Sequence, residues 1–440
     1  MPNTLVHTPI PEGDSVATIY SKIRWRIAPF LILLYIAAFL DRVNISFASL
    51  SMNRDLKISD SLFGLGAGIF FIGYLVFAIP SNIMLLRFGA RRWIAVIMVA
   101  WGLLSSAMAF VHGAPMYVVL RSLLGAAEAG FFPGIVLYLT RWLPSGARAA
   151  FTALFVLAIP LSNVIGAPLS NWILSFGGQE GLKSWQWLFL IEGIPAAVLG
   201  VLVLYLLSEG PQTVRWLTGD EKEILRRILE EDQSHSPSEV DALGWTVLLR
   251  KPLVLGYAAQ YFVLMIGLYA LGFWISRILT SRGVLSVNLG WLTAVPFAVG
   301  AAGMLVGSWS SDRLRERKWH LLLSFLCASL GMVAAAPARH WAVVLAGLSL
   351  SAAGVFSAMP IFWTAVTQGV GSRLSALAIA FVNSVGNVGG LAGPLMIGSI
   401  LQRTGSYTDG LLFTGSSLML GALLIFFSPA RPVSLGKGSA

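Results

Sequence analysis

The chain has 440 residues, of which 56% are hydrophobic and only 11% are charged. Because soluble globular domains carry about 25% charged residues, this composition excludes a soluble globule and indicates a polytopic membrane protein. The net charge of +10 does not point to nucleic acid as a partner, since the basic residues lie in short loops between apolar spans. The single cysteine, Cys327, allows no internal disulfide and no cysteine-based metal cage.

Apolar windows of about 20 residues, the length that crosses ~30 Å of hydrocarbon, occur as six plus six along the chain. We therefore predict an all-α integral membrane protein with 12 transmembrane helices in two six-helix pseudo-symmetric halves. The segment before the first window lacks the basic-then-apolar layout of a cleavable signal, so the first span is expected to act as an uncleaved signal. The expected windows are 27–50, 63–85, 93–111, 117–140, 149–173, 185–207, 253–277, 289–309, 319–336, 340–363, 375–400 and 410–428.

A long polar segment separates the two sets of spans and is rich in acidic and basic residues. We expect it to be a solvated cytoplasmic linker with a short amphipathic surface helix; docking or regulation is the alternative role. The predicted organisation is an N-terminal cytoplasmic tail (1–26), a first half (27–207), the linker (208–252), a second half (253–428) and a C-terminal cytoplasmic tail (429–440).

The first span carries charges within an otherwise apolar run, where Asp41 and Arg42 are adjacent and Asn44 follows. An ionisable group near the bilayer centre costs roughly 2.5–3.5 kcal/mol on insertion scales, so it usually faces a wet cavity or a partner. Because neighbouring residues point about 100° apart on a helix, Asp41 and Arg42 are not expected to serve each other. Each is predicted to have a partner on another segment.

The turn after the second span is basic and contains Arg87 and Arg91, and its counterpart in the second half contains Asp312 and Arg313. We predict that these turns set the topology and latch the gate at the cytoplasmic edge, and that they do not contact a substrate. The first turn has Leu86 at the position of the acid, which leaves the form of its latch open.

The fourth span places Arg121, Gly125 and Glu128 on one stripe, because positions i, i+4 and i+7 share a helix face. With Asp41 and Arg42, the first half then has two acids and two bases within the membrane. The sequence predicts that these four ionised side chains converge on a water-accessible chamber at mid-depth. A substrate anion that arrives at an arginine can then change the proton affinity of a nearby carboxylate. The alternative is a buried network that only holds helices together.

Neutral polar side chains on other spans are candidates for lining this chamber, although each residue type is also common as packing. Glu192 in the sixth span is expected to hold a helix contact and not to take part in transport. The candidates are Tyr74 in the second span, Asn163 in the fifth, Tyr269 in the seventh, Trp363 and Thr364 in the tenth, and Asn383 and Asn387 in the eleventh.

The two halves are related in sequence by a gap-free shift of 226 residues, which brings Gly64 onto Gly290 and Pro168 onto Pro394. One shift that serves such distant positions indicates duplicated halves, as in transporters whose site lies between two repeats near mid-depth. We expect charge and proton handling in the first half, because the shift sets the four intramembrane charges opposite the neutral residues Gly267, Leu268, Gly347 and Gly354.

Loop charges predict the orientation, since Lys and Arg are in excess on the cytoplasmic side. With the N-terminus inside, inner segments hold 15 basic residues, including Arg431 and Lys437 near the C-terminus, against 6 in outer loops. Both termini and the linker are therefore expected in the cytoplasm. No enzyme site, cofactor or metal is expected, because the sequence has neither a phosphate-cradling Gly-Lys-Ser/Thr loop nor a His, Cys and carboxylate cluster with ligand spacing.

These residues resemble the major facilitator superfamily, and specifically its anion:cation symporter branch, over nearly all of 20–430. The resemblance implies the major facilitator fold and proton-driven uptake, across a bacterial inner membrane, of organic anions such as sugar acids, tartrate, phthalate or hydroxyphenylacetate. It rests on Phe39-Leu-Asp41-Arg42-Val-Asn44, Gly68-Ile-Phe-Phe71 with Tyr74 and Pro80-Ser-Asn82, the stretch from Arg121 to Gly134, Phe189-Leu-Ile-Glu192-Gly193 and Phe362-Trp-Thr364.

The resemblance also implies roles for individual residues. Asp41 and Glu128 would be the protonating carboxylates, Arg42 would bind the substrate carboxylate, and Arg121 would be an electrostatic partner of the acids. Tyr74, Trp363, Thr364 and Asn383 would line the pocket.

The expected function is thus a proton-coupled importer of a small carboxylate that works by alternating access, as a monomer in the lipid bilayer. A metabolite or drug exporter of the same fold is one alternative, which the direction of flux would distinguish. A transporter-like sensor that binds without turnover is another, which an absence of counterflow would reveal.

Overall fold

The computed structural model describes residues 14–178, 180–234, 251–370 and 372–428. In this part the chain forms helices without a strand, and 12 stretches are long and apolar enough to cross a membrane. The predicted all-α fold with 12 spans is therefore confirmed. The predictions for residues 1–13, 235–250 and 429–440, which include Arg431 and Lys437, lie outside the described residues.

Helix bounds follow the predicted windows, and the membrane helices extend beyond most of them. The first half consists of α1 (Asp14–Asp55), α2 (Asp60–Phe88), α3 (Ala90–Ala107) with the 3₁₀ turn η1 (Met108–Phe110), α4 (Ala114–Glu128) and α5 (Phe131–Thr140), which form one span, α6 (Ser145–Ser175) and α7 (Ser184–Leu206). The linker has η2 (Pro211–Thr213) and α8 (Gly219–Ser234). The second half consists of α10 (Pro252–Ser281), α11 (Ser286–Leu314), α12 (Lys318–Ala335), α13 (Trp341–Val370), α14 (Ser372–Thr404) and α15 (Tyr407–Phe427).

Local sequence explains where several helices begin and end. The Ser59 side chain accepts a hydrogen bond from Leu62 N and so caps the start of α2, as expected for a serine at this position. Gly89 ends α2 and precedes α3 with φ at 83°, a left-handed conformation that glycine adopts without steric cost. α1 begins at Asp14 and therefore reaches into the segment predicted as an N-terminal tail.

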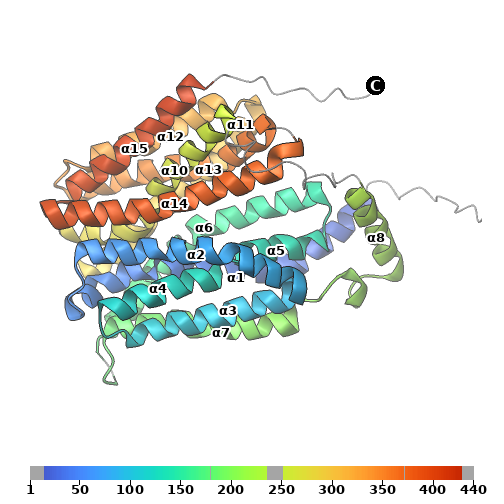
Figure 1. Ribbon diagram of the computed structural model, residues 1–440, viewed down its shortest axis with the longest axis horizontal. Coiled ribbons are helices and arrows are strands. Elements are labelled where there is room, and N and C mark those ends of the chain that lie inside the picture. Colours follow the sequence, from blue (N-terminus) through green and yellow to red (C-terminus); the bar gives the residue numbers. More distant parts are fainter. Residues whose placement is uncertain (1–13, 179, 235–250, 371, 429–440) are drawn as a thin grey trace, which may run out of the picture.

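The helix bounds repeat along the chain as the sequence shift predicts. Advancing the bounds of α2 by 226 positions gives those of α11, and the same step moves the last residue of α1 to the last residue of α10. The second half lies above the first in Figure 1, with the membrane helices of both halves running roughly side by side.

The halves meet along two symmetry-related helix pairs, α2 with α14 and α6 with α11. A methyl group added at Gly64 would stand 2.4 Å from Pro394 O, and one at Gly290 would stand 2.9 Å from Pro168 Cα. Gly64 and Gly290 correspond under the shift, and so do the two prolines, so one close backbone contact is made twice. Small residues permit such approach between membrane helices.

One end of the bundle carries α8 and the α2–α3 turn, and we call it the linker end; the opposite end is the far end (Figure 1). Contacts between the halves gather towards the far end. Asp60 on α2 forms an ion pair with Arg277 on α10, and its backbone N–H donates to Gln402 Oε1 on α14 at 3.1 Å. Asn171 Nδ2 on α6 donates to Ser286 O on α11 at 2.9 Å. The far end is therefore closed in this conformation.

Candidate functional site

Arg42 lies where three helices and both halves meet. Its Nη2 forms an ion pair with Glu128 Oε1 on α4, and its Nη1 donates to Tyr269 Oη on α10 at 3.1 Å. The side chains are largely buried, with 11% of Arg42 and 4% of Glu128 exposed. A buried pair of this kind is costly to break by removing one partner, because the other charge is left uncompensated.

Aromatic rings surround the Arg42 guanidinium. Its Cζ lies 4.6 Å from the centre of the Phe39 ring and 5.1 Å from that of Phe70, within the range of cation–π attraction. Tyr35 and Tyr74 lie close enough to interact electrostatically with both Arg42 and Glu128. Arg42 Nε is buried without a hydrogen-bond partner among the described residues, so the guanidinium keeps unused donor capacity.

Asp41 does not contact Arg42 and is held by a separate set of donors, although it interacts electrostatically with Glu128. That the four charges share one water-accessible chamber stays a prediction. Its carboxylate accepts hydrogen bonds from Trp101 Nε1 and Ser105 Oγ on α3, and from Asn44 Nδ2 at 3.0 Å. The side chain is 2% exposed. The separation follows from the helical step of about 100° per residue, which directs Asp41 and Arg42 to different neighbours.

Arg121 interacts electrostatically with both Asp41 and Glu128 but does not contact either carboxylate, and its role as their charge partner stays a prediction. Its Nε donates to Gly66 O at 3.1 Å, and the guanidinium lies beside the rings of Phe70 and Phe273. Among the described residues Arg121 forms no ion pair, and its Nη2 is buried without a hydrogen-bond partner. The seven positions between Arg121 and Glu128 give one face but about 10 Å of separation along the helix axis, so the two side chains lie at different depths.

The neutral candidates divide into those at Arg42 and those elsewhere. Tyr269 and Tyr74 lie at the arginine, whereas Trp363 packs on Tyr261 with ring centres 4.8 Å apart. Thr364 Oγ1 donates to Pro360 O at 2.9 Å on its own helix. The buried Asn163 side chain donates to Ile159 O at 3.1 Å, Asn387 is half-buried, and Asn383 is exposed.

The residues of the two basic turns that are described below contact partners within their own halves or at the start of the linker. Arg91 donates to Leu204 O and pairs weakly with Glu209 at 3.5 Å. In the second half Asp312 pairs with Arg317 at 2.6 Å. Arg87 lies beside the Phe88 ring, and Arg313 lies beside the Trp309 ring.

Sequence reasoning missed several residues of the charged region. Tyr35 precedes Arg42 by seven positions, a spacing that places both on one helix face and could have identified it. Trp101 and Ser105, the partners of Asp41, are spaced by four and share a face of α3 in the same way. Nothing in the sequence alone assigns that face to Asp41.

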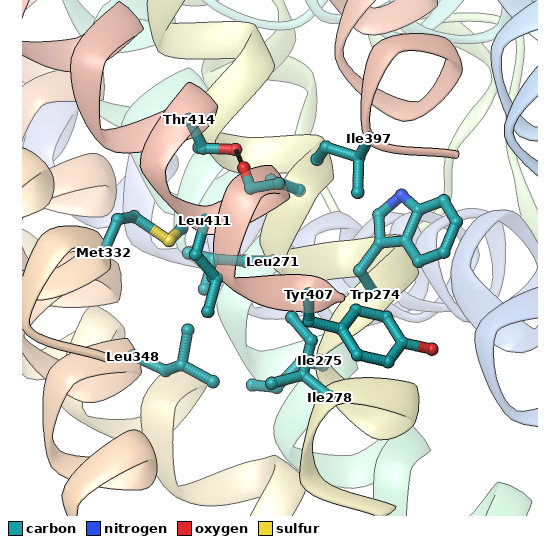
Figure 2. A pocket seen from close by; sticks show the side chains of 12 residues that line it. Leu271, Trp274, Ile275, Ile278, Met332, Leu348, Ile397, Tyr407, Leu411 and Thr414 are labelled. Carbon is teal, nitrogen blue, oxygen red and sulfur yellow. Dashed lines mark hydrogen bonds between the residues drawn. The ribbon is translucent and has the colours of Figure 1, made fainter. Parts of the chain in front are cut away.

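A separate apolar cavity lies inside the second half and does not touch these charges. Figure 2 shows Leu271, Trp274, Met332, Leu348 and Leu411 around it. Two hydroxyl groups line it, on Tyr407 and Thr414. The Thr414 hydroxyl already donates to Gly410 O at 2.9 Å (Figure 2). This lining lacks the cationic donors that an anion requires. Among the described residues no cluster of three His, Cys, Asp or Glu side chains could hold a metal.

Comparisons with known proteins agree with this architecture. The model of the "Major Facilitator Superfamily" matches residues 31–394. A "Putative tartrate transporter" from Agrobacterium vitis is 43% identical over 94% of this chain and 92% of its own length. A "Quinolone resistance transporter" from Acinetobacter baumannii is 35% identical over 96% of both chains. Among solved structures, a bacterial homologue of the human lysosomal transporter Spinster has a TM-score of 0.73 at 18% identity, covering 92% of this chain and 96% of that chain.

Proposed function

Because the chain belongs to the Major Facilitator Superfamily, we propose that it is a proton-coupled symporter that imports a small organic anion by alternating access. The observation that carries the proposal is the buried contact of Arg42 with Glu128 and Tyr269 between the two halves. An arginine held this way can bind one carboxylate through parallel N–H donors, which is the geometry that guanidinium groups favour.

The ion pair supplies a coupling rule. Glu128 occupies the guanidinium that a substrate carboxylate would need, so substrate and Glu128 compete for Arg42. A proton on Glu128 removes its charge and frees Arg42 for the anion. Conversely, an anion at Arg42 deprives Glu128 of its cation, which favours protonation of Glu128. Proton and anion therefore promote each other's binding.

The same rule favours joint movement across the membrane. With Glu128 protonated and the anion on Arg42, the local charge is as neutral as in the empty ion pair. Either form can pass through a dry constriction at lower cost than a lone arginine, because an unpaired charge is expensive in a low-dielectric interior. Asp41, held by donors and without a cation partner among the described residues, is proposed as a second proton-binding carboxylate.

The charges of the loops indicate the orientation of the protein in the membrane. The linker end carries Arg87, Arg91 and Arg92 in the α2–α3 turn, and the excess of basic residues on that side favours a cytoplasmic position in a bacterial inner membrane. The closed far end would then face outward, and the conformation would be one that exchanges substrate with the cytoplasm.

Tartrate-like and sugar-acid substrates are the first candidates for the anion. The Agrobacterium vitis relative is named as a tartrate transporter, which is the reason to begin with tartrate. Tyr35, Tyr74 and Tyr269 near Arg42 provide hydroxyl groups for a hydroxylated acid and rings for an aromatic one.

Export is the second candidate function, and the Acinetobacter baumannii relative named for quinolone resistance favours it. The same pair could serve an antiporter if proton and substrate bound alternately. The direction of flux under a proton gradient separates the two.

The test is uptake into proteoliposomes with an imposed pH gradient, using tartrate, a sugar acid and an aromatic acid as probes. We expect gradient-driven accumulation of at least one probe, lost in Arg42→Ala and in the double variant Asp41→Asn with Glu128→Gln. Accumulation that survives the double variant contradicts the coupling, and so does the absence of uptake of every probe by the unaltered protein. Movement of a probe against the proton flow supports export.

A further inference from the structure

A second buried polar cluster lies on the side of α1 away from Arg42. It consists of Asp41 and Asn44 on α1, Ser105 on α3, Ser170 on α6 and Glu192 on α7. The α3–α7 crossing beside it is tight, since a methyl group at Gly193 would stand 2.7 Å from Ser106 N. Glu192 belongs to no part of the anion site.

Glu192 is a buried carboxyl that has few partners. Ser170 Oγ donates to its Oε1 at 2.7 Å, which provides the predicted helix contact between α6 and α7. Its Oε2 is buried without a hydrogen-bond partner, and no Lys, Arg or His among the described residues pairs with it. An ionised carboxylate in such a place would be very costly, so the neutral acid is the form that fits.

Asn44 links Glu192 to Asp41. Its Nδ2 donates to Asp41 Oδ1 at 3.0 Å, while its Oδ1 is buried without a donor. Asn44 and Asp41 both lie close enough to Glu192 to interact with its carboxyl group. Glu192 Oε2 and Asn44 Oδ1 thus each lack a donor, and a proton on Glu192 would add a donor to this cluster.

We propose that Glu192 is a proton-binding residue that is protonated in this conformation and is coupled to Asp41 through Asn44. Asp41 has three donors and can bear a charge, whereas Glu192 has one. Asp41 is the titratable group that faces Glu192 from α1; α3 presents Trp101 and Ser105 to this cluster, and α6 presents Ser170.

The consequence is that the two carboxyls do not ionise independently. Like charges in a dry cluster disfavour each other, so their protons are released in steps that belong to the pair. If the symport proposed above holds, on which this consequence rests, Glu192 adjusts when Asp41 accepts or releases its proton.

Infrared difference spectroscopy of the purified full chain tests the protonation directly. Glu192→Gln should remove a carbonyl stretching band of a protonated carboxyl at neutral pH, and Ser170→Ala should shift that band by removing its hydrogen-bond donor. Glu230→Gln, on the surface of α8, is the control and should leave the region unchanged. If neither Glu192→Gln nor Ser170→Ala alters a protonated-carboxyl band, the proposal is overturned. Ser170→Ala keeps the test open if Glu192→Gln fails to fold.

The coupling has its own readout. We expect Glu192→Gln to move the pH dependence of the Asp41 carboxylate band, measured in the same spectra, relative to Glu230→Gln. An Asp41 band that titrates identically in both variants would show that Glu192 is only a structural contact. Neither spectrum requires substrate, so the result stands whether or not proton-coupled uptake is found.

Discussion

Arg42 makes two directional contacts at once, which a simple point charge would not do. The guanidinium reaches Glu128 on α4 with one nitrogen and Tyr269 on α10 with another. Its planar fork allows both contacts, whereas a lysine ammonium is a compact point charge on a flexible stem. The residue therefore joins the halves at the proposed anion site.

Two replacements of Arg42 distinguish the contribution of its charge from that of its planar geometry to anion binding. Arg42→Lys should weaken binding of the transported carboxylate, and Arg42→Ala should weaken it further, by about 2 kcal/mol or more, which is roughly 30-fold in Kd. Calorimetry on the purified protein measures both. The exposed Arg54, replaced by Lys, is the matched control. Equal affinity in Arg42→Lys and the unaltered protein would contradict the two-contact assignment.

Part of the site could be predicted at this scale, and part could not. The divergence of Asp41 and Arg42 follows from adjacent positions on a helix and was predictable. That Glu128 pairs with Arg42, while Arg121 pairs with no acid among the described residues, depends on helix depth and rotation. Depth and rotation are set by packing between helices, which cannot be read from hydrophobic pattern and residue spacing in one sequence.

The backbones of α2 and α14 approach each other closely at the closed far end. At Gly64 the hydrogen atom in place of a side chain lets Pro394 O come near, and Gly398 lies against Asp60 O in the same way. Each contact lies near the Asp60–Arg277 ion pair that joins the halves. Closure of the far end thus depends on the absence of two methyl groups as well as on charge.

Gly64→Ala should shift the protein towards conformations open at the far end, because the new methyl group would lie 2.4 Å from a backbone oxygen that cannot rotate away. Spin labels on cysteines that replace Arg54 and Arg403, both exposed, in a Cys327→Ala background would lie further apart in Gly64→Ala. Double electron–electron resonance measures this distance. Gly113→Ala, which meets nothing within 4 Å, is the control. An unchanged distance in Gly64→Ala would show that these contacts do not determine closure.

The α8 helix is held to α1 by a contact that depends on pH. Lys22 Nζ donates to Glu221 Oε1 at 2.6 Å, and this hydrogen bond, with that from Thr218 N, lowers the pKa of Glu221 below its ordinary value of 4.5. A lowered pKa means that the stabilisation is complete above pH 4.5 and is lost as the pH falls through the lowered value. Glu221→Gln should remove it at neutral pH.

Hydrogen exchange followed by mass spectrometry checks this prediction. Amides of α8 should exchange faster in Glu221→Gln than in Glu230→Gln, because Glu230 pairs with Arg226 within α8 and does not reach α1. The effect is expected to be modest, since ion pairs near the surface contribute about 0–1 kcal/mol. Equal exchange in the two variants would mean that α8 is held by its other contacts, which include the hydrogen bonds from Ser145 to Asp232.

The whole molecule is a duplicated bundle whose two halves differ in intramembrane charge. The same 226-residue step that relates α2 to α11 pairs the four intramembrane charges, Asp41, Arg42, Arg121 and Glu128, with neutral residues of α10 and α13. The fold was predictable because hydrophobic length and internal repetition are properties of the sequence. Which end is closed was not predictable, since both conformations of such a bundle share one sequence and differ only in which contacts between the halves form.

Anion and proton are proposed to promote each other's binding at Arg42 and Glu128, and linkage makes such coupling reciprocal. Calorimetric titration with the transported carboxylate, repeated in buffers of different ionisation enthalpy, counts the protons taken up per anion bound. We predict net proton uptake by the unaltered protein near neutral pH and markedly less in Glu128→Gln. Equal proton uptake in both proteins, with normal anion affinity, would contradict the account.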